Sequence, residues 1–127
     1  MTMGLLGGIG LLACAIAIYG VINSAAKGNL PRNGGAGIRT VGTRSSDEAW
    51  LAGHRAALPT ARLVGLICGA LAVLLVIAGA MDGKPDPTVT IVVLFVLGYG
   101  IMLGGAFYLA RVADRAARET LGPSGSN

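Results

Sequence analysis

The sequence predicts an all-α membrane protein with three transmembrane helices and a short amphipathic helix in the loop between the first two. Hydrophobic residues make up 54% of the 127 residues and charged residues only 13%, whereas charged residues approach ~25% of a soluble domain. Three apolar stretches without a charge cover residues 3–22, 63–81 and 89–110. A helix of about 18 or more apolar residues can cross the hydrocarbon core of a bilayer. A soluble three-helix domain is disfavoured because too little polar sequence remains to cover three such helices.

The first stretch, residues 3–22, is expected to be an uncleaved helix. A signal peptide has a basic region ahead of its apolar core, and residues 1–4 contain no basic side chain. Leu11-Leu12-Ala13-Cys14 loosely resembles a lipoprotein cleavage box, but it lacks the same basic start. We therefore expect this segment to stay in the membrane as a span.

The loop between the first two spans, residues 24–62, divides into two parts. Ser24 to Gly37 is rich in Gly, Asn and Pro, which predicts irregular chain. Ser45-x-x-Glu48 resembles a capping box, in which the Ser and Glu side chains each satisfy a free backbone N–H. A short helix should therefore run from Ser46 to about Leu58, where Pro59 would end it.

This short helix has an apolar face. Trp50, His54 and Leu58 recur at every fourth residue, with Asp47 and Arg55 roughly opposite. The pattern is typical of an amphipathic helix that lies on a membrane surface with its Trp at the level of the headgroups.

The spans also carry packing information. Each contains one pair of glycines four residues apart, which allows close approach between helices, within one chain or between copies in a homo-oligomer; the pairs are Gly4 and Gly8, Gly65 and Gly69, and Gly100 and Gly104. Tyr99 lies within the third span and needs a partner for its hydroxyl, either a backbone carbonyl or a hydroxyl such as that of Thr90. Cys14 and Cys68 are predicted to fill space rather than form a disulfide or a metal site.

Beyond residue 110 the third helix should continue out of the membrane. Arg111, Asp114, Arg115 and Arg118 share one side, and we interpret them as a solvated charged stripe. Gly122-Pro123 would end the helix. The sequence thus predicts a single membrane domain over residues 1–121 and a disordered tail over residues 122–127.

The basic residues predict the orientation. Lys and Arg accumulate on the cytoplasmic side of membrane proteins. The loop at residues 24–62 and the tail hold nearly all of them, whereas the connection between the second and third spans holds only Lys84, beside Asp82 and Asp86. We therefore expect the loop and the C-terminus in the cytoplasm and the N-terminus outside. The net charge of +4 reflects this bias, and no nucleic-acid-binding motif accompanies it.

A carrier or channel made from one copy of the chain is disfavoured by what the spans lack. No Asp, Glu, Lys, Arg or His lies within them, and ion or proton pathways usually need ionisable groups at membrane depth. We predict no catalytic residue, no metal and no cofactor. Membrane lipids and an unidentified protein or peptide are the expected partners.

The most informative stretch is residues 33–54, which we call the motif. It reads Asn33-x3-Gly37-Ile38-Arg39-Thr40-x2-Thr43-x2-Ser46-x3-Trp50-x3-His54. Such a specific polar pattern between apolar spans predicts a folded cap or a site for a partner. In the cap hypothesis, Asn33, Arg39, Ser46 and His54 bond one another while Trp50 anchors the helix in the membrane interface.

Individual motif residues keep alternative roles. Gly37 could allow a special backbone conformation, and Asn33 could cap a turn. Arg39 could pair with lipid phosphate. Thr40, Thr43 and Ser46 could cap the helix or bond nearby backbone. We favour a hydrogen-bonding His54 over a catalytic one, because a catalytic constellation needs a partner group.

The motif resembles the signature of the SdpI family of small bacterial integral membrane proteins. The resemblance implies a non-enzymatic protein of the bacterial cell membrane, with a role in immunity to a membrane-active peptide toxin or in signalling by holding a repressor at the membrane. An accessory subunit of a larger membrane complex is the alternative. A membrane enzyme using His54 and Arg39 is the least favoured class.

Overall fold

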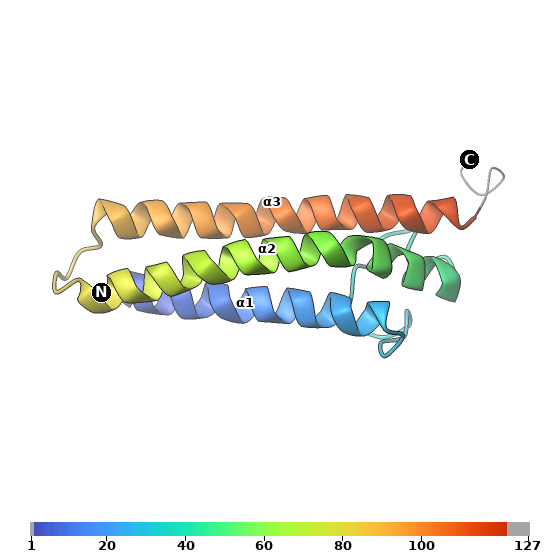
Figure 1. The fold of residues 1–127 in the computed structure, drawn as a ribbon, viewed down its shortest axis with the longest axis horizontal. Helices are drawn as coiled ribbons and strands as arrows, with labels where there is room; N and C mark the ends of the chain where they lie inside the picture. The colour runs from blue at the N-terminus through green and yellow to red at the C-terminus, as the bar shows by residue number, and fades with distance from the viewer. Residues whose placement is uncertain (1, 122–127) are drawn as a thin grey trace. The chain divides into compact units, whose positions relative to one another are not determined.

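The computed structural model describes residues 2–121 and is all-helical over that range. Helix α1 covers Thr2–Ala26, α2 covers Asp47–Met81 and α3 covers Val89–Glu119 (Figure 1). The all-α prediction with three long apolar helices is confirmed. The predicted disordered tail, residues 122–127, lies outside the described residues.

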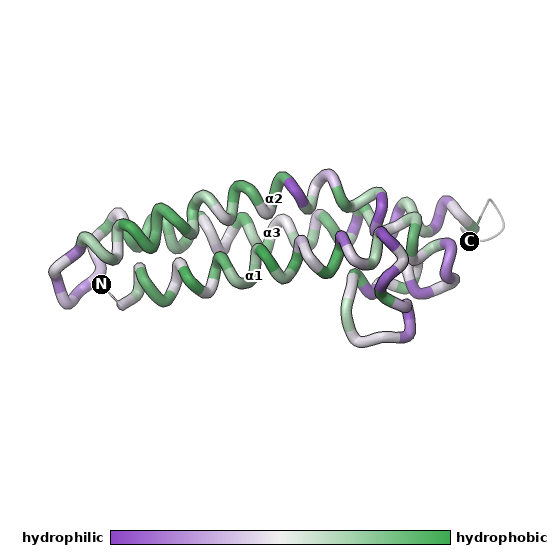
Figure 2. The backbone as a smooth tube through the Cα atoms, turned by 60° about the horizontal axis from the view of Figure 1, so that its bottom comes forward, coloured by the Kyte–Doolittle hydropathy of each residue, from purple (hydrophilic) through white to green (hydrophobic). Residues whose placement is uncertain are grey.

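All three helices are long and apolar enough to cross a membrane. Only 28%, 22% and 17% of the most apolar windows of α1, α2 and α3 are buried by the protein itself. Large apolar side chains such as Leu66 and Val96 are 74% and 64% exposed, and hydrophobic residues dominate these stretches in Figure 2. Because water would disfavour so much bare apolar surface, the helices are suited to a lipid environment.

The loop contains no separate fourth helix. We predicted a helix that ends at Pro59, but α2 runs continuously from Asp47 through Pro59 to Met81. Proline removes the hydrogen bond that its own N–H would donate four residues back, to the carbonyl of Arg55, and its ring crowds that carbonyl. Helices that pack against neighbours tolerate this loss. The segment that we assigned to the membrane surface is therefore the first part of α2.

The chain forms two compact units, and each helix contributes to both. The first comprises residues 2–17 and Leu63–Gly104, and the second comprises Ile18–Arg62 and residues 105–121.

In the first unit, α1 packs closely on α2 through glycine. A Cβ built on Gly4 would lie 2.6 Å from the Cα of Gly79, and one built on Gly8 would lie 2.8 Å from the carbonyl oxygen of Ala72. Both distances are too short for a real side chain, so these glycines permit the contact. The first predicted glycine pair therefore serves packing within the chain. A Cβ built on Gly100 or Gly104 would instead meet nothing within 4 Å outside its own helix turn.

The third helix joins this unit through an aromatic pair. The rings of Phe95 and Tyr99 lie 4.5 Å apart, and the Tyr99 hydroxyl donates a 2.8 Å hydrogen bond to the carbonyl of Gly7. The predicted backbone partner for Tyr99 is thus confirmed. Both cysteine thiols are free, that of Cys14 exposed and that of Cys68 buried.

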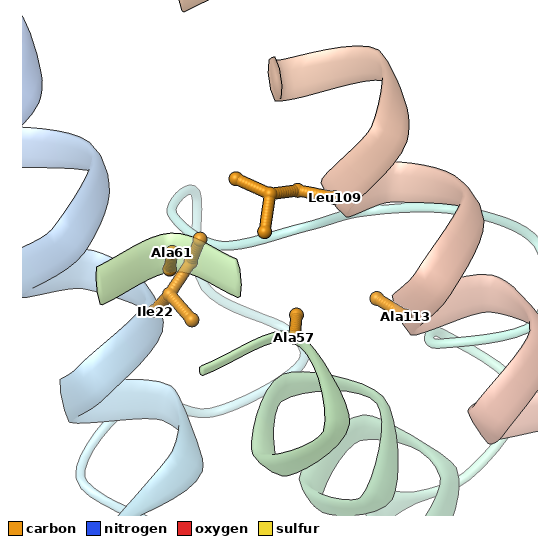
Figure 3. Close-up of a cluster of buried hydrophobic side chains, with 5 residues drawn as sticks. All are labelled: Ile22, Ala57, Ala61, Leu109 and Ala113. Atoms are coloured by element: carbon orange, nitrogen blue, oxygen red, sulfur yellow. The ribbon is translucent and has the colours of Figure 1, made fainter. Parts of the chain in front are cut away.

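The core of the second unit is small. Its buried members come from all three helices and are drawn in Figure 3: Ile22, Ala57, Ala61, Leu109 and Ala113. Three of the five are alanines, which let the helices approach closely. Figure 2 shows that polar residues gather on the loop between α1 and α2. The second unit contains the motif.

Candidate functional site

The chain leaves α1 through a defined turn. Gly28 has a positive φ of 83°, its N–H bonds to the Ala25 carbonyl, and the N–H of Asn29 bonds to the Ser24 carbonyl. This pair of bonds is the Schellman motif that commonly ends helices. The turn leads directly to Leu30, whose carbonyl is used by the motif.

Trp50 is an internal anchor of the motif. Its side chain is 2% exposed, and its indole N–H donates a 2.9 Å hydrogen bond to the carbonyl of Leu30. We predicted Trp50 in the membrane interface, and this is wrong. The face of α2 that looked amphipathic in the sequence is covered by the loop and by the small core of the second unit, since Ala57 is buried there as well.

His54 bonds through both ring nitrogens. The N–H of Ile38 donates to its Nε2 at 2.8 Å, so Nε2 must carry a lone pair. Its Nδ1 lies 2.8 Å from the Trp50 carbonyl and must therefore carry the proton and donate. These two contacts select one neutral tautomer. Since His54 is fully buried and has no free lone pair, the geometry favours a structural role over metal binding or base catalysis.

Gly37 fits beneath the two rings. The centroids of Trp50 and His54 lie 4.2 Å apart, and a Cβ on Gly37 would lie 2.5 Å from Cη2 of Trp50. The φ of Gly37 is 114°, a value that side chains disfavour. Both observations explain why the motif has glycine at this position.

Thr40 and Thr43 shape the turn that follows. The buried Thr43 hydroxyl donates to the Ile38 carbonyl at 2.7 Å and accepts from the Thr40 N–H at 2.9 Å. The Thr40 hydroxyl accepts from the Thr43 N–H at 3.1 Å. The two hydroxyls thus supply hydrogen-bond partners to backbone N–H and C=O groups that would lack them in an irregular loop.

Asp114 links this turn to α3. Its Oδ1 accepts hydrogen bonds from the Thr40 hydroxyl at 2.6 Å and from the Gly42 N–H at 2.9 Å. Its Oδ2 accepts from Arg118 at 2.7 Å. We interpreted Asp114 as part of a solvated stripe, and this is wrong.

Two further glycines let the turn and the helices meet. A Cβ on Gly42 would collide with Oδ1 of Asp114, and one on Gly53 would lie 2.8 Å from the carbonyl oxygen of Ala113. Sequence reasoning missed Gly42, Gly53 and Asp114. The available signal was Asp114 itself, a carboxylate among arginines at the distal end of the third helix.

Ser46 begins α2. Its Oγ accepts a 3.0 Å hydrogen bond from the N–H of Ala49, so Ser46 is the N-cap residue. The predicted capping box at Ser45 and Glu48 does not form, because the N-cap is Ser46 and the Ser45 hydroxyl instead donates to the Gly42 carbonyl at 2.6 Å.

The remaining two motif residues lie on the outside. Arg39 is exposed and donates to the backbone carbonyls of Arg32 and Gly34. Asn33 is exposed and lines a cavity of about 420 Å³ with Arg39. The predicted network in which Asn33, Arg39, Ser46 and His54 bond one another is wrong, since each has other partners or lies on the surface.

The motif therefore forms one folded cap, with residues from three elements held by hydrogen bonds to buried groups. Within residues 2–121, no cluster of three His, Cys, Asp or Glu side chains could hold a metal ion. What the cap offers outward is its arginine-rich loop surface.

Comparison with known proteins now gives this cap a context. A family model of the SdpI/YfhL protein family matches residues 29–108, a range that includes the whole motif, α2 and most of α3. No curated protein and no solved structure matches the chain. The matched range covers well over half of the sequence, and its helices are long and apolar enough to span a membrane. The chain is therefore an integral membrane protein that belongs to the SdpI/YfhL protein family.

Proposed function

We propose that this protein is a non-enzymatic partner in toxin immunity or membrane signalling in a bacterial cell membrane. In this role the folded cap presents a fixed surface to a protein or peptide. Family membership and the internal organisation of the motif both support the proposal.

The observation that carries the proposal is how the buried polar groups of the motif are used. Both nitrogens of His54 are bonded to backbone, and Thr43 bonds to the backbone of Ile38. A group whose donors and acceptors are already satisfied is poorly placed to bind a substrate or transfer a proton. A rigid cap favours recognition by shape and charge.

Immunity can be tested in the bacterium of origin. Cells lacking the gene would be exposed to culture supernatant of the intact strain, and membrane potential would be followed with a voltage-sensitive dye. We expect the deletion strain to lose its potential and the wild-type chain to restore it. A chain carrying Asp114→Ala, which loosens the cap, should restore it less. Equal resistance with and without the gene would contradict the immunity role.

An accessory subunit of a larger complex is the second candidate. The surface of α3 at Gly100 and Gly104 is open, since a Cβ added at either would meet nothing within 4 Å. Such a surface suits close packing against another helix. Purification in mild detergent followed by mass measurement separates the two roles. A large complex of fixed stoichiometry supports the accessory role, and a monomer or small homo-oligomer supports immunity or signalling.

We further propose that the motif loop and the C-terminus face the cytoplasm. The supporting observation is the concentration of Lys and Arg in those segments. Gly35 and Gly83 are exposed, and a Cβ added at either would meet nothing within 4 Å. Each can therefore be replaced by Cys in a chain whose Cys14 and Cys68 are Ala. Only Gly83→Cys should react with a membrane-impermeant thiol reagent outside intact cells, and outside labelling of Gly35→Cys would reverse the orientation.

A further inference from the structure

The surface of the motif loop contains a basic cavity that the folded cap does not use. It has a volume of about 420 Å³ and belongs wholly to the second unit; its lining residues, together called the arginine cavity, are Arg32, Asn33, Arg39, Val41 and Arg44. Three arginines thus line one space. The carboxylate that pairs with one of them is Asp47, bonded to Arg32 at 2.8 Å, and its side chain is 88% exposed. About two positive charges remain unbalanced around the cavity.

The loop backbone holds the side chains of two of these arginines, Arg32 and Arg39. Arg32 donates through Nη1 to the carbonyl of Arg44 at 3.1 Å. Arg39 donates through Nη1 to the carbonyl of Arg32 at 3.0 Å and to the carbonyl of Gly34. Each contact uses one edge of a guanidinium group, so other N–H groups stay available. Like charges are therefore fixed near one another by a folded loop, which costs free energy unless an anion balances them.

We propose that the arginine cavity binds a phosphate group. The planar fork of arginine matches the oxygens of phosphate and can donate two parallel hydrogen bonds to them. The amide of Asn33 adds a further donor at the cavity wall. The site is distinct from the buried His54 cluster and does not depend on a role in immunity or signalling.

Two sources could supply this phosphate, an anionic phospholipid or a soluble phosphate. Basic pockets beside membrane-spanning helices bind lipid headgroups. Val41 lines the cavity and is 79% exposed, so it offers an apolar contact to the glycerol or acyl part of a lipid. Inorganic phosphate could use the arginines but not Val41.

The test measures ligand-induced stabilisation of the full chain in a non-ionic detergent. One arm titrates a short-chain phosphatidylglycerol, and the other titrates inorganic phosphate against sodium chloride at equal ionic strength. Ligand binding raises the melting temperature in a saturable way. Saturation with phosphatidylglycerol alone assigns a lipid, and saturation with inorganic phosphate assigns a soluble anion.

The variants isolate the cavity from the fold. Arg44 is exposed, and its side chain makes no hydrogen bond or ion pair within residues 2–121, so Arg44→Gln should keep the folded state. Its matched control is Arg115→Gln, the same change at an exposed arginine of α3. We expect Arg44→Gln to weaken the apparent Kd about tenfold or more, the order expected for a lost hydrogen bond to a charged group. Arg115→Gln should bind like the wild type.

A second pair of variants leaves every arginine in place. Val41→Asp puts a carboxylate at the cavity wall, where it should compete with phosphate, whereas Val41→Asn has nearly the same shape without the charge. We expect Val41→Asp to abolish saturation and Val41→Asn to keep it. The proposal is overturned if neither ligand gives a saturable rise in the wild type, or if Arg44→Gln and Val41→Asp both bind as tightly as their controls.

Discussion

The carboxylate of Asp114 accepts a 2.6 Å hydrogen bond from the hydroxyl of Thr40, 74 residues earlier in the chain. The same oxygen accepts the N–H of Gly42. These hydrogen bonds attach the loop turn to the C-terminal part of α3. If the turn moved, the Thr40 hydroxyl and the Gly42 N–H would lose their acceptor.

Replacement of Asp114 by Ala should destabilise the cap. It leaves the Thr40 hydroxyl and the Gly42 N–H without their acceptor, and hydrogen bonds to a charged group contribute about 1.5–3 kcal/mol. We expect the free energy of unfolding in detergent to fall by about 2 kcal/mol or more. The control is Arg118→Gln, which removes only the partly exposed ion pair and should cost less than about 1 kcal/mol. An equal loss in both variants would show that Asp114 acts through Arg118.

Gly37→Ala should be among the most damaging small changes in the loop. The φ of 114° disfavours any side chain, and the new methyl group would collide with Trp50. Strained backbone of this kind costs about 1–3 kcal/mol, and the collision adds to it. Gly35→Ala is the matched control, since Gly35 has open space around it and no positive φ. Thermal melting should show a clear loss for Gly37→Ala and little change for Gly35→Ala.

Trp50 and Arg39 should differ sharply. Trp50→Ala removes a buried indole, which costs about 3–5 kcal/mol in a packed interior. Arg39→Ala removes hydrogen bonds on an exposed surface, worth about 1 kcal/mol. Trp50→Phe should lie between them because it keeps one aromatic ring but loses the rest of the indole and its hydrogen bond to the carbonyl of Leu30. Similar melting of the Trp50→Ala and wild-type chains would contradict the buried position of the indole.

His54→Gln should retain more stability than His54→Ala. A Gln amide can supply both an acceptor for the Ile38 N–H and a donor for the Trp50 carbonyl, although its shape differs from that of imidazole. Ala leaves the Ile38 N–H unsatisfied, at a cost of about 1–3 kcal/mol. Melting temperatures of both variants, with and without a chelator, provide the measurement. If Gln is as damaging as Ala and a chelator destabilises the wild type, His54 holds a metal and the structural role is wrong.

Gly79→Ala should weaken the first unit, whereas Gly100→Ala should not. A Cβ on Gly79 would meet the backbone of Gly4 and Leu5 at 2.7–2.9 Å, and backbone cannot yield as a side chain can. We expect a loss of about 1–3 kcal/mol, typical of overpacking. Gly100 has open space, so Ala there should be neutral or should stabilise the helix by up to about 1 kcal/mol. Equal behaviour of the two variants in detergent melting would contradict the close packing of α1 and α2.

The three long helices could be predicted because long stretches without charge are a local property of the sequence. The continuation of α2 through Pro59 could not be predicted in this way. A proline removes one hydrogen bond locally, but packing in the second unit decides whether the helix continues, as the burial of Ala57 and Ala61 shows. The sequence also predicts the wrong cap for α2, because Ser45 and Ser46 are equally good caps in sequence. In the structure the Ser45 hydroxyl donates to the carbonyl of Gly42, and Ser46 caps the helix.

The candidate site was predicted as a set of residues but not as an arrangement. Pairing of Asp114 with Arg118 four residues later gives a complete local explanation for both, and so it conceals the contact with Thr40. Trp50 was assigned to the interface because its face of the helix looks amphipathic. Only the path of the loop reveals that Leu30 and Gly37 cover it.

Trp50 is the only tryptophan of the chain, and it is 2% exposed within the motif. Its ultraviolet emission therefore comes from the second unit alone, while circular dichroism reports on all three helices. If the motif opens before the helices unfold, emission shifts to longer wavelength while the dichroism stays constant. The unlabelled protein thus carries its own optical probe of local opening. The emission transition gives the free energy of that opening, and the dichroism transition gives the free energy of global unfolding.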